Sequence, residues 1–356
     1  MSMKKVVILA AAALTLVACA KTYELQETAQ PKIGFDTWAN NLTKARTQGS
    51  STFAAGDDFA VYGYKDKSDN SDPKTVFNGV TVSTTDGTAW SYETPRFWDS
   101  NYDKYIFHAV SPAAAVTGGT VNAQTGVIST ATITFTGNDN DILVADKKQV
   151  DKGSAPYFNN YATVPLVFNH VASLVDIKVK KTTALANVSV TVSAFELENI
   201  YKKGALSVNT YDTNKPVATW SDVETGTYGP TVAITTPIEI VKDTNFDPAT
   251  PGTPADATSI INNLVVKPQT FTASDGTNPQ QISITYKIGA EDAVTKVLYL
   301  ADFDTVDDAD QSDDKIAKWE PGKHYTFYIT LDAHAINFSA TITDWTAVSG
   351  YNYLVY

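Results

Sequence analysis

The fold is decided by short alternating stretches, of which the clearest is Gln281-Ile282-Ser283-Ile284-Thr285-Tyr286. Apolar side chains recur there at every second residue, which is the period of a strand with one buried face. Similar stretches stand between Gly, Asn, Asp and Pro clusters at 58–64, 79–82, 105–110, 131–135, 175–179, 187–192 and 325–331. Many short strands separated by turns, without a long helical pattern, predict an all-β fold of antiparallel sandwiches.

The chain is long enough for two such sandwiches. It has 356 residues, of which 43% are hydrophobic, and chains of this length usually divide into more than one core. A polar passage at 150–160 precedes the strand-like stretch 164–168. We therefore expect an N-terminal β-sandwich at 47–158 and a C-terminal β-sandwich at 159–345.

The first residues form an export signal. Lys4 and Lys5 precede an apolar run at 6–18, which is shorter than the roughly 20 residues that a membrane-spanning helix needs. Leu16-Val17-Ala18-Cys19 matches the lipobox of bacterial lipoproteins. We predict a signal peptide at 1–18, cleavage between Ala18 and Cys19, and lipidation of Cys19 by acyl chains such as palmitate. The alternative is an ordinary signal peptide with an incidental cysteine.

Composition excludes several functions. Cys19 is the one cysteine of the chain, so none remains for a disulfide, a zinc site or a thiol nucleophile. The formal net charge of −12 would repel nucleic acid. The sequence contains no GxSxG elbow and no phosphate-cradling glycine loop. We predict that the protein is not an enzyme and that it has no cofactor and no resident metal.

Two groups of residues are of types that can bind metal ions. The acidic loop 302–314 offers the oxygen ligands that calcium takes, although it lacks the EF-hand spacing; a solvated loop is favoured, and calcium binding stays open. The histidines have no metal-binding spacing and are interpreted as structural; they are His108, His170, His324 and His334.

Three aromatic residues could form a platform on which a sugar stacks. They are Trp90, Trp98 and Tyr102. Aromatic residues near strand ends more often belong to the core, and this is the favoured interpretation.

An ordered set of patterns covers nearly the whole chain after the signal peptide. It comprises Asp57-Asp58-Phe59-Ala60-Val61-Tyr62-Gly63, Trp90-Ser91-Tyr92-Glu93, Phe97-Trp98, 105–112, 141–145, 164–174, Val265-Val266-Lys267-Pro268-Gln269, 319–325 and Ile342-Thr343-Asp344-Trp345. This set resembles the fimbrillin family, the subunits of type V pili on Gram-negative anaerobes of the gut and mouth. The resemblance implies two transthyretin-like antiparallel β-sandwich domains in tandem and a lipoprotein precursor at the cell outer membrane.

The resemblance also implies maturation at the cell surface. On this resemblance, a trypsin-like, arginine-specific protease would remove the first strand of the amino-terminal domain, and a neighbouring subunit would fill the vacancy. Here Ile33 and Phe35 alternate as in a strand, and Arg46 lies in the polar linker after them. We predict a propeptide at 19–46, a removable strand containing Ile33 and Phe35, and a cut between Arg46 and Thr47. Lys44 is a second candidate for the cut, and a plain solvated linker is the alternative.

The chain continues beyond the pattern that ends at Trp345. Residues 346–356 form a free-ended stretch with apolar side chains on both faces, which is an aggregation hazard unless it has a designated slot. We interpret this stretch as the donor strand that adds to a neighbour's sheet, its apolar residues being Val348, Tyr351, Tyr353, Leu354, Val355 and Tyr356. The alternative is the last strand of its own domain.

The sequence therefore predicts a structural subunit of a cell-surface pilus, or fimbrium, that polymerises by donor-strand exchange and supports adhesion and colonisation. Its expected partners are other pilin subunits, the outer membrane through the lipid, an arginine-specific protease, and a host or microbial surface receptor. The alternative is a tip adhesin or a glycan-binding surface lipoprotein. A stalk, accessory or tip position, the receptor and the identity of the protease are left open.

Overall fold

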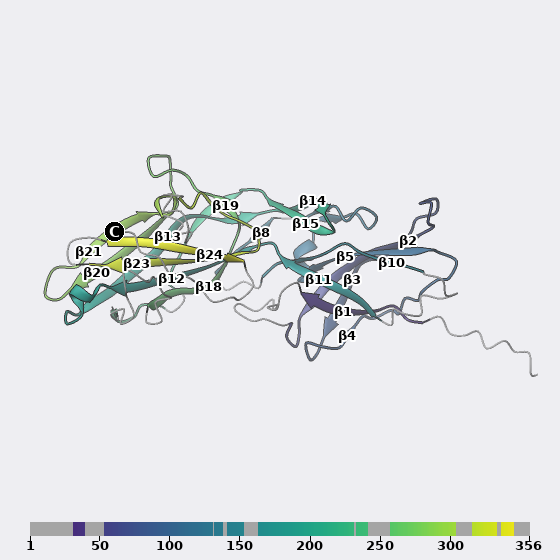
Figure 1. Cartoon of the computed structure of the whole chain (residues 1–356), viewed down its shortest axis with the longest axis horizontal. Helices are drawn as coiled ribbons and strands as arrows, with labels where there is room; N and C mark the ends of the chain where they lie inside the picture. Colours follow the sequence, from purple (N-terminus) through teal and green to yellow (C-terminus); the bar gives the residue numbers. More distant parts are fainter. Residues whose placement is uncertain are drawn as a thin grey trace, which may run out of the picture.

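The computed structural model describes residues 31–39, 53–130, 132–137, 141–152, 163–230, 233–240, 257–303, 315–332 and 336–344. These residues build an elongated molecule of β-strands, with one large sheet at one end and several smaller sheets toward the other (Figure 1). Three short 3₁₀ helices are present among them, η2 (Ala113–Val116), η3 (Thr183–Leu185) and η4 (Leu300–Asp302). The predicted all-β class is confirmed.

The first sheet has eight strands in the order β1-β11-β9-β5-β2-β3-β4, with β10 paired to β5. Apart from the parallel pair β1 and β11, its pairings are antiparallel. Its strands are β1 (Gly34–Ala39), β2 (Asp58–Asp66), β3 (Lys74–Thr84), β4 (Trp90–Ser91), β5 (Lys104–Ser111), β9 (Leu143–Ala145), β10 (Lys148–Asp151) and β11 (Thr163–His170).

Four further sheets build the rest of the described chain. One has the order β18-β12-β23-β24, in which β12 and β23 are parallel; its strands are β18 (Thr258–Val266), β12 (Ser173–Lys181), β23 (Lys323–Leu331) and β24 (Ile336–Asp344). A second has the order β16-β13-β20-β21, with β17 and β8 also paired to β13; its strands are β16 (Glu224–Tyr228), β13 (Val190–Gly204), β20 (Gln281–Ile288), β21 (Val294–Tyr299), β17 (Ile238–Glu239) and β8 (Ile133–Thr134).

The two remaining sheets are smaller. One has the order β15-β14-β7-β6, formed by β15 (Lys215–Trp220), β14 (Leu206–Asp212), β7 (Ile128–Ser129) and β6 (Thr120–Val121). The other pairs β19 (Gln269–Thr270) with β22 (Lys318–Trp319). Among the described residues, no helix is long and apolar enough to cross a membrane.

The alternating stretches form strands with the expected buried faces. In β20, Ile282, Ile284 and Tyr286 are buried while the residues between them are partly exposed. The expected stretch at 187–192 begins later than predicted, because β13 starts at Val190 and Val188 lies in a turn, donating its N–H to the carbonyl of Leu185. Binary alternation therefore identified the strands well, and their ends less well.

Strand pairing crosses the expected division at residue 158. The strand β11 lies after that position and pairs with β1 and β9 of the first sheet. Conversely, β7 and β8 lie before it and pair with β14 and β13. The residues at 153–162 lie outside the described part, and the division into two tandem transthyretin-like domains stays a prediction.

The hydrophobic core has two parts. One cluster fills one face of the first sheet and includes Phe59, Phe107 and Phe168. The larger cluster begins on the opposite face of the same sheet, at Ala60 and Val110, and continues through the other sheets. Because β2 and β5 are buried on both faces, the first sheet is packed against the rest of the molecule.

Candidate subunit-assembly site

The strand β1 lies at the edge of the first sheet, and in the sequence residues 40–52 separate it from the part of the sheet that begins with β2. It pairs in parallel with β11 along its whole length, from Gly34 opposite Thr163 to Ala39 opposite Phe168. Ile33 and Phe35 are 0% and 4% exposed, so both point into the core. A strand that comes first in the chain thus completes a sheet made by later residues.

Phe35 is enclosed by aromatic rings. Its ring centre lies 5.3–6.2 Å from those of Phe59, Phe77, Tyr92 and Phe107, in edge-on or tilted arrangements. Such geometries are the favourable ones for aromatic pairs. Burial of a phenylalanine side chain contributes roughly 1.5–3 kcal/mol, so Phe35 is a main anchor of β1.

The start of β1 is also held on the side away from β11. The N–H of Ile33 donates to the carbonyl of Arg96 at 2.8 Å, and the N–H of Trp98 donates to the carbonyl of Pro31 at 3.1 Å. The hydroxyl of Tyr92 donates to the carbonyl of Ile33 at 2.5 Å, and burial raises the pKa of this phenol. Residues 31–35 therefore fill a slot between β11 and the segment 96–98, which we call the β1 slot.

The other residues predicted for maturation and assembly lie outside the described residues. They are Ala18 and Cys19, Arg46 and Thr47, and Val348, Tyr351, Tyr353, Leu354, Val355 and Tyr356. Their roles stay predictions.

The second arginine of the chain lies in the folded part. The guanidinium of Arg96 donates to the carbonyls of Val76 and Thr94 at 3.1 and 3.2 Å, beside the β1 slot.

Trp98 belongs to the core, which was the favoured interpretation of the three aromatic residues, and not to a sugar platform. This side chain is 2% exposed and packs against Tyr105 and Phe107, because it closes the core beside β1. Trp90 is half-buried and packs against Phe53 and Phe59. The ring of Tyr102 contacts two lysines, whose ammonium groups lie 4.2 Å (Lys65) and 5.1 Å (Lys67) from its centre.

Two of the described histidines pair with carboxylates. His170 pairs with the buried carboxylate of Asp141, whose pKa is raised by burial. His324 lies 3.0 Å from Asp176. No group of three or more His, Cys, Asp or Glu residues arranged to hold a metal occurs in the described part. Of the acidic loop, residues 304–314 lie outside it, while Asp302 accepts a hydrogen bond from Ser274 at 3.3 Å.

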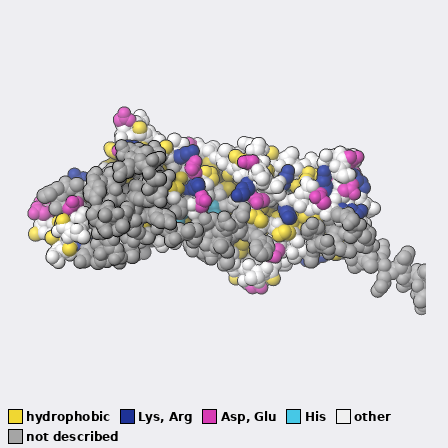
Figure 2. All heavy atoms as spheres, viewed as in Figure 1, with side chains coloured by type: hydrophobic (Ala, Val, Ile, Leu, Met, Phe, Trp, Pro, Cys, Tyr) yellow, Lys and Arg dark blue, Asp and Glu magenta, His cyan; other side chains and the backbone are white. Residues whose placement is uncertain are grey.

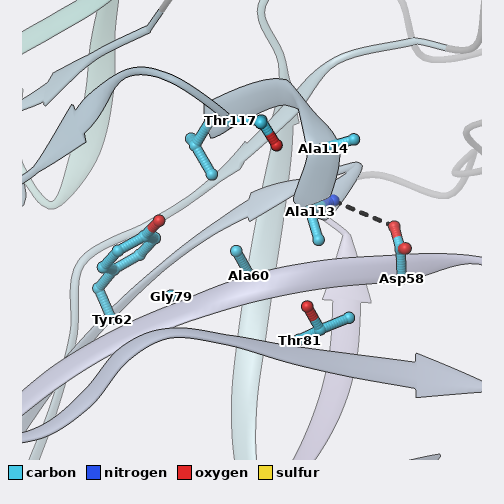
Figure 3. A pocket seen from close by; sticks show the side chains of 9 residues that line it. Asp58, Ala60, Tyr62, Gly79, Thr81, Ala113, Ala114 and Thr117 are labelled. Atoms are coloured by element: carbon cyan, nitrogen blue, oxygen red, sulfur yellow. Dashed lines mark hydrogen bonds between the residues drawn. The ribbon is translucent and has the colours of Figure 1, made fainter.

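A shallow pocket of about 400 Å³ lies on the face of β2 and β3 that is covered by η2. Figure 3 shows Asp58 at one end of it and the hydroxyl of Tyr62 at the other, with Ala60 between them. The carboxylate of Asp58 accepts a hydrogen bond from the N–H of Ala113 at 3.0 Å. Carboxylate and hydroxyl groups around small side chains suit a small hydrogen-bonding molecule.

Charges of both signs are interspersed on the face shown in Figure 2, including the end that carries the first sheet. Such a surface suits solubility more than it suits binding of a strongly charged polymer.

Comparison with known proteins decides the family. The chain matches the family described as fimbrillin-like over residues 43–345. The chain belongs to the fimbrillin-like family. This confirms the resemblance found in the sequence, and the family consists of structural fimbrial subunits, which is consistent with a protein that is not an enzyme.

Two solved structures are similar to this fimbrillin-like chain, and the first of them has the same overall fold. A fimbrial protein from Bacteroides vulgatus aligns with a TM-score of 0.52 at 16% identity, over 88% of this chain and 99% of that one. A fimbrilin from Porphyromonas gingivalis aligns with a TM-score of 0.41 at 12% identity, over 90% and 99%. No curated protein matches the chain. Family membership supports a subunit of a cell-surface fimbrium that assembles with other pilin subunits.

Sequence reasoning found Ile33 and Phe35 but missed the residues that receive them. Nothing in the sequence marks Phe59, Phe77 or Phe107 as neighbours of Phe35 rather than as ordinary core residues.

Proposed function

We propose that this fimbrillin-like chain is exported as a lipid-anchored precursor, cut after Arg46, and polymerised by strand exchange. The donor is the segment 346–356 of one copy, and the acceptor is the β1 slot of the next. The observation that carries this proposal is the burial of Ile33 and Phe35 in an edge segment that pairs with β11 and precedes Arg46 in the chain.

The slot has to be filled rather than left open. Without β1, the backbone of β11 loses its parallel partner and the rings around Phe35 face solvent. Burial of Ile33 and Phe35 contributes roughly 1.5–3 kcal/mol each, and ladder hydrogen bonds add about 0.5–1.5 kcal/mol apiece. A cut after Arg46 therefore loosens β1 without expelling it, and a competing strand displaces it.

The end of the chain has the pattern that such a strand needs. Tyr351, Tyr353 and Val355 alternate, as Ile33 and Phe35 do, and an aromatic ring among them can replace the ring of Phe35. Backbone hydrogen bonds to β11 then give affinity, and the aromatic pocket gives register.

One cut would serve two purposes. Cys19 and β1 both lie before Arg46, so cleavage separates the subunit from its lipid and from its own strand together. A subunit held at the outer membrane as a lipoprotein is thereby released at the cell surface when it becomes able to polymerise. This order of events prevents assembly before export.

The cut is tested by a pair of proteases. An arginine-specific protease is expected to convert the wild-type precursor into ladders of polymer on gels, whereas Arg46→Lys stays monomeric. Trypsin, which also cuts after lysine, restores polymer from Arg46→Lys. Arg96→Lys is the matched control and should polymerise like the wild type. Polymer from Arg46→Lys under the arginine-specific protease would refute the assignment of the site.

The donor is tested by truncation. Deleting residues 348–356 should leave a precursor that folds and is cut but stays monomeric. A truncated subunit that still forms normal filaments would show that the donor lies elsewhere.

The alternative is a tip adhesin or glycan-binding protein, and the pocket between β2, β3 and η2 is the observation that favours it. The carboxylate of Asp58 and the phenol of Tyr62 suit sugar hydroxyls. A glycan array probed with the wild type, Asp58→Asn and Tyr62→Phe tests this function. Binding that is lost in both variants supports it, and an array without any binding rejects it.

A further inference from the structure

His108 is a buried histidine that the assembly site does not use. It lies in β5, the strand between β2 and β9 of the first sheet. Its neighbours Phe107 and Ala109 point into the cluster around β1, so His108 points to the opposite face. The side chain is 0% exposed.

Two elements of the sheet β15-β14-β7-β6 cover this histidine. Gly126, in the turn between β6 and β7, approaches so closely that a Cβ added there would lie 2.3 Å from the imidazole. The ring of Tyr211 in β14 has its centre 5.2 Å from that of His108. The hydroxyl of Tyr211 donates to the carbonyl of Gly126 at 3.2 Å, which ties the two elements together over the imidazole. We call His108, Gly126 and Tyr211 the His108 joint.

A second contact lies beside the joint. The N–H of Lys147, between β9 and β10, donates to the carbonyl of Asn214 at 2.8 Å, in the turn that links β14 to β15. The β14–β15 hairpin thus rests on the first sheet, and Figure 1 shows it reaching toward the end of the molecule that carries that sheet.

The imidazole is enclosed without hydrogen bonds. Neither Nδ1 nor Nε2 of His108 has a partner among the described residues. A buried polar atom without a partner is costly, and a buried charge without one is more so. Burial, helped by the ammonium of Lys147, lowers the pKa of His108 to about 4.

The groups that face the imidazole offer no free anion. From β2 and β14 come Tyr62 and Tyr211, and burial raises the pKa of each, so both stay neutral. The connection between β9 and β10 brings Lys147, which is positive, and Asp146, whose carboxylate accepts the amide of Asn169 at 2.7 Å. The turn at 122–127 has no charged side chain.

We propose that the His108 joint is an acid-sensitive latch between the first sheet and the β14–β15 hairpin. A neutral imidazole lets the hairpin and the turn 122–127 pack down on β5. A protonated imidazole needs water or an anion, which the closed joint does not supply, so the hairpin lifts from the sheet. This inference is independent of cleavage and strand exchange, and it concerns the stiffness of a single subunit.

The direction of the effect follows from proton linkage. An exposed imidazole takes up a proton below about pH 6.5, whereas the enclosed one does so only near pH 4. Between these values the open joint binds more protons than the closed joint, so acid favours opening. The open population should rise by about tenfold per pH unit, up to about 300-fold, and level off below pH 4.

Hydrogen exchange of the full chain tests the latch. We expect amides of 122–127 and 206–220 to lose protection between pH 6.5 and pH 4, after correction for the intrinsic pH dependence of exchange. In His108→Leu, which cannot be protonated, protection of these segments should not change over that range. His324→Gln is the matched control, because this half-exposed histidine pairs with Asp176 away from the joint, and it should behave like the wild type.

Two results would overturn the latch. One is unchanged protection of both segments in the wild type down to pH 4. The other is the same loss in His108→Leu. If His108→Leu does not fold, titration of the imidazole by NMR in the wild type decides the question, since a pKa at or above 6.5 contradicts an enclosed neutral ring.

Discussion

Replacing Phe35 with alanine removes the side chain that anchors β1 in its slot. Phe35 is 4% exposed and touches four aromatic rings, so the loss combines transfer of the ring to water with a cavity among those rings. Such substitutions cost about 3–5 kcal/mol. Because each 1.4 kcal/mol is a factor of ten, β1 should leave a subunit cut after Arg46 about a thousandfold more readily.

Two measurements check this prediction. Urea unfolding of the uncut Phe35→Ala precursor should show the stability loss in the transition of the first sheet. After the cut, native mass spectrometry should show the segment before Arg46 retained by the wild type and released by the variant. Lys32→Ala is the control, because Lys32 is exposed and its ammonium lies 4.9 Å from the ring centre of Tyr92, a contact worth about 0.5–1 kcal/mol.

A loss below about 1 kcal/mol in Phe35→Ala would refute the reasoning, since a cavity in a packed core costs more than that. Equal retention of the cut segment by the variant and the wild type would have the same consequence. Either result would mean that β1 is held by its backbone ladder to β11 and that side chains contribute little.

Other predictions concern the scaffold around the slot. Gly79→Ala should cost about 1–2 kcal/mol in urea unfolding, because Gly79 has φ +70° and a Cβ would lie 3.1 Å from the hydroxyl of Tyr62; Gly229→Ala, where nothing lies within 4 Å, should cost clearly less. Asp222→Ala should destabilise the protein by about 2 kcal/mol, because the fully buried ammonium of Lys267 then loses the half-exposed carboxylate of Asp222. Lys267→Met should be close to neutral, because it removes the buried charge itself. Asp86 accepts the N–H groups of Thr88 and Ala89, which lowers its pKa to about 2; its stabilising effect should be complete above about pH 4 and lost as the pH falls through 2, and an NMR titration of the carboxyl group checks this.

Much of the fold could be read from local patterns. The alternation at 281–286 reports which side chains are buried, and the structure buries those residues in β20. The same reasoning placed strands at 58–64 and 105–110, now parts of β2 and β5. It also pointed to Ile33 and Phe35 as strand residues with a buried face.

Partner choice could not be read in this way. Alternation says that one face of a strand is buried, but every apolar face in a β protein is an acceptable partner for it. The pairing of β1 with β11 and the pairing of β7 and β8 with β14 and β13 depend on contacts between residues far apart in sequence.

The sequence by itself determined the all-β class, the negative net charge, the match to a lipobox at Cys19 and the family. These follow from composition and from patterns a few residues long, which keep their meaning in any tertiary setting. Only the tertiary structure decided that Phe35 sits among four rings from distant strands and that His108 is enclosed by Gly126 and Tyr211. The environment of a buried group is set by the segments that pack against it. A local sequence pattern does not specify which distant segments these are.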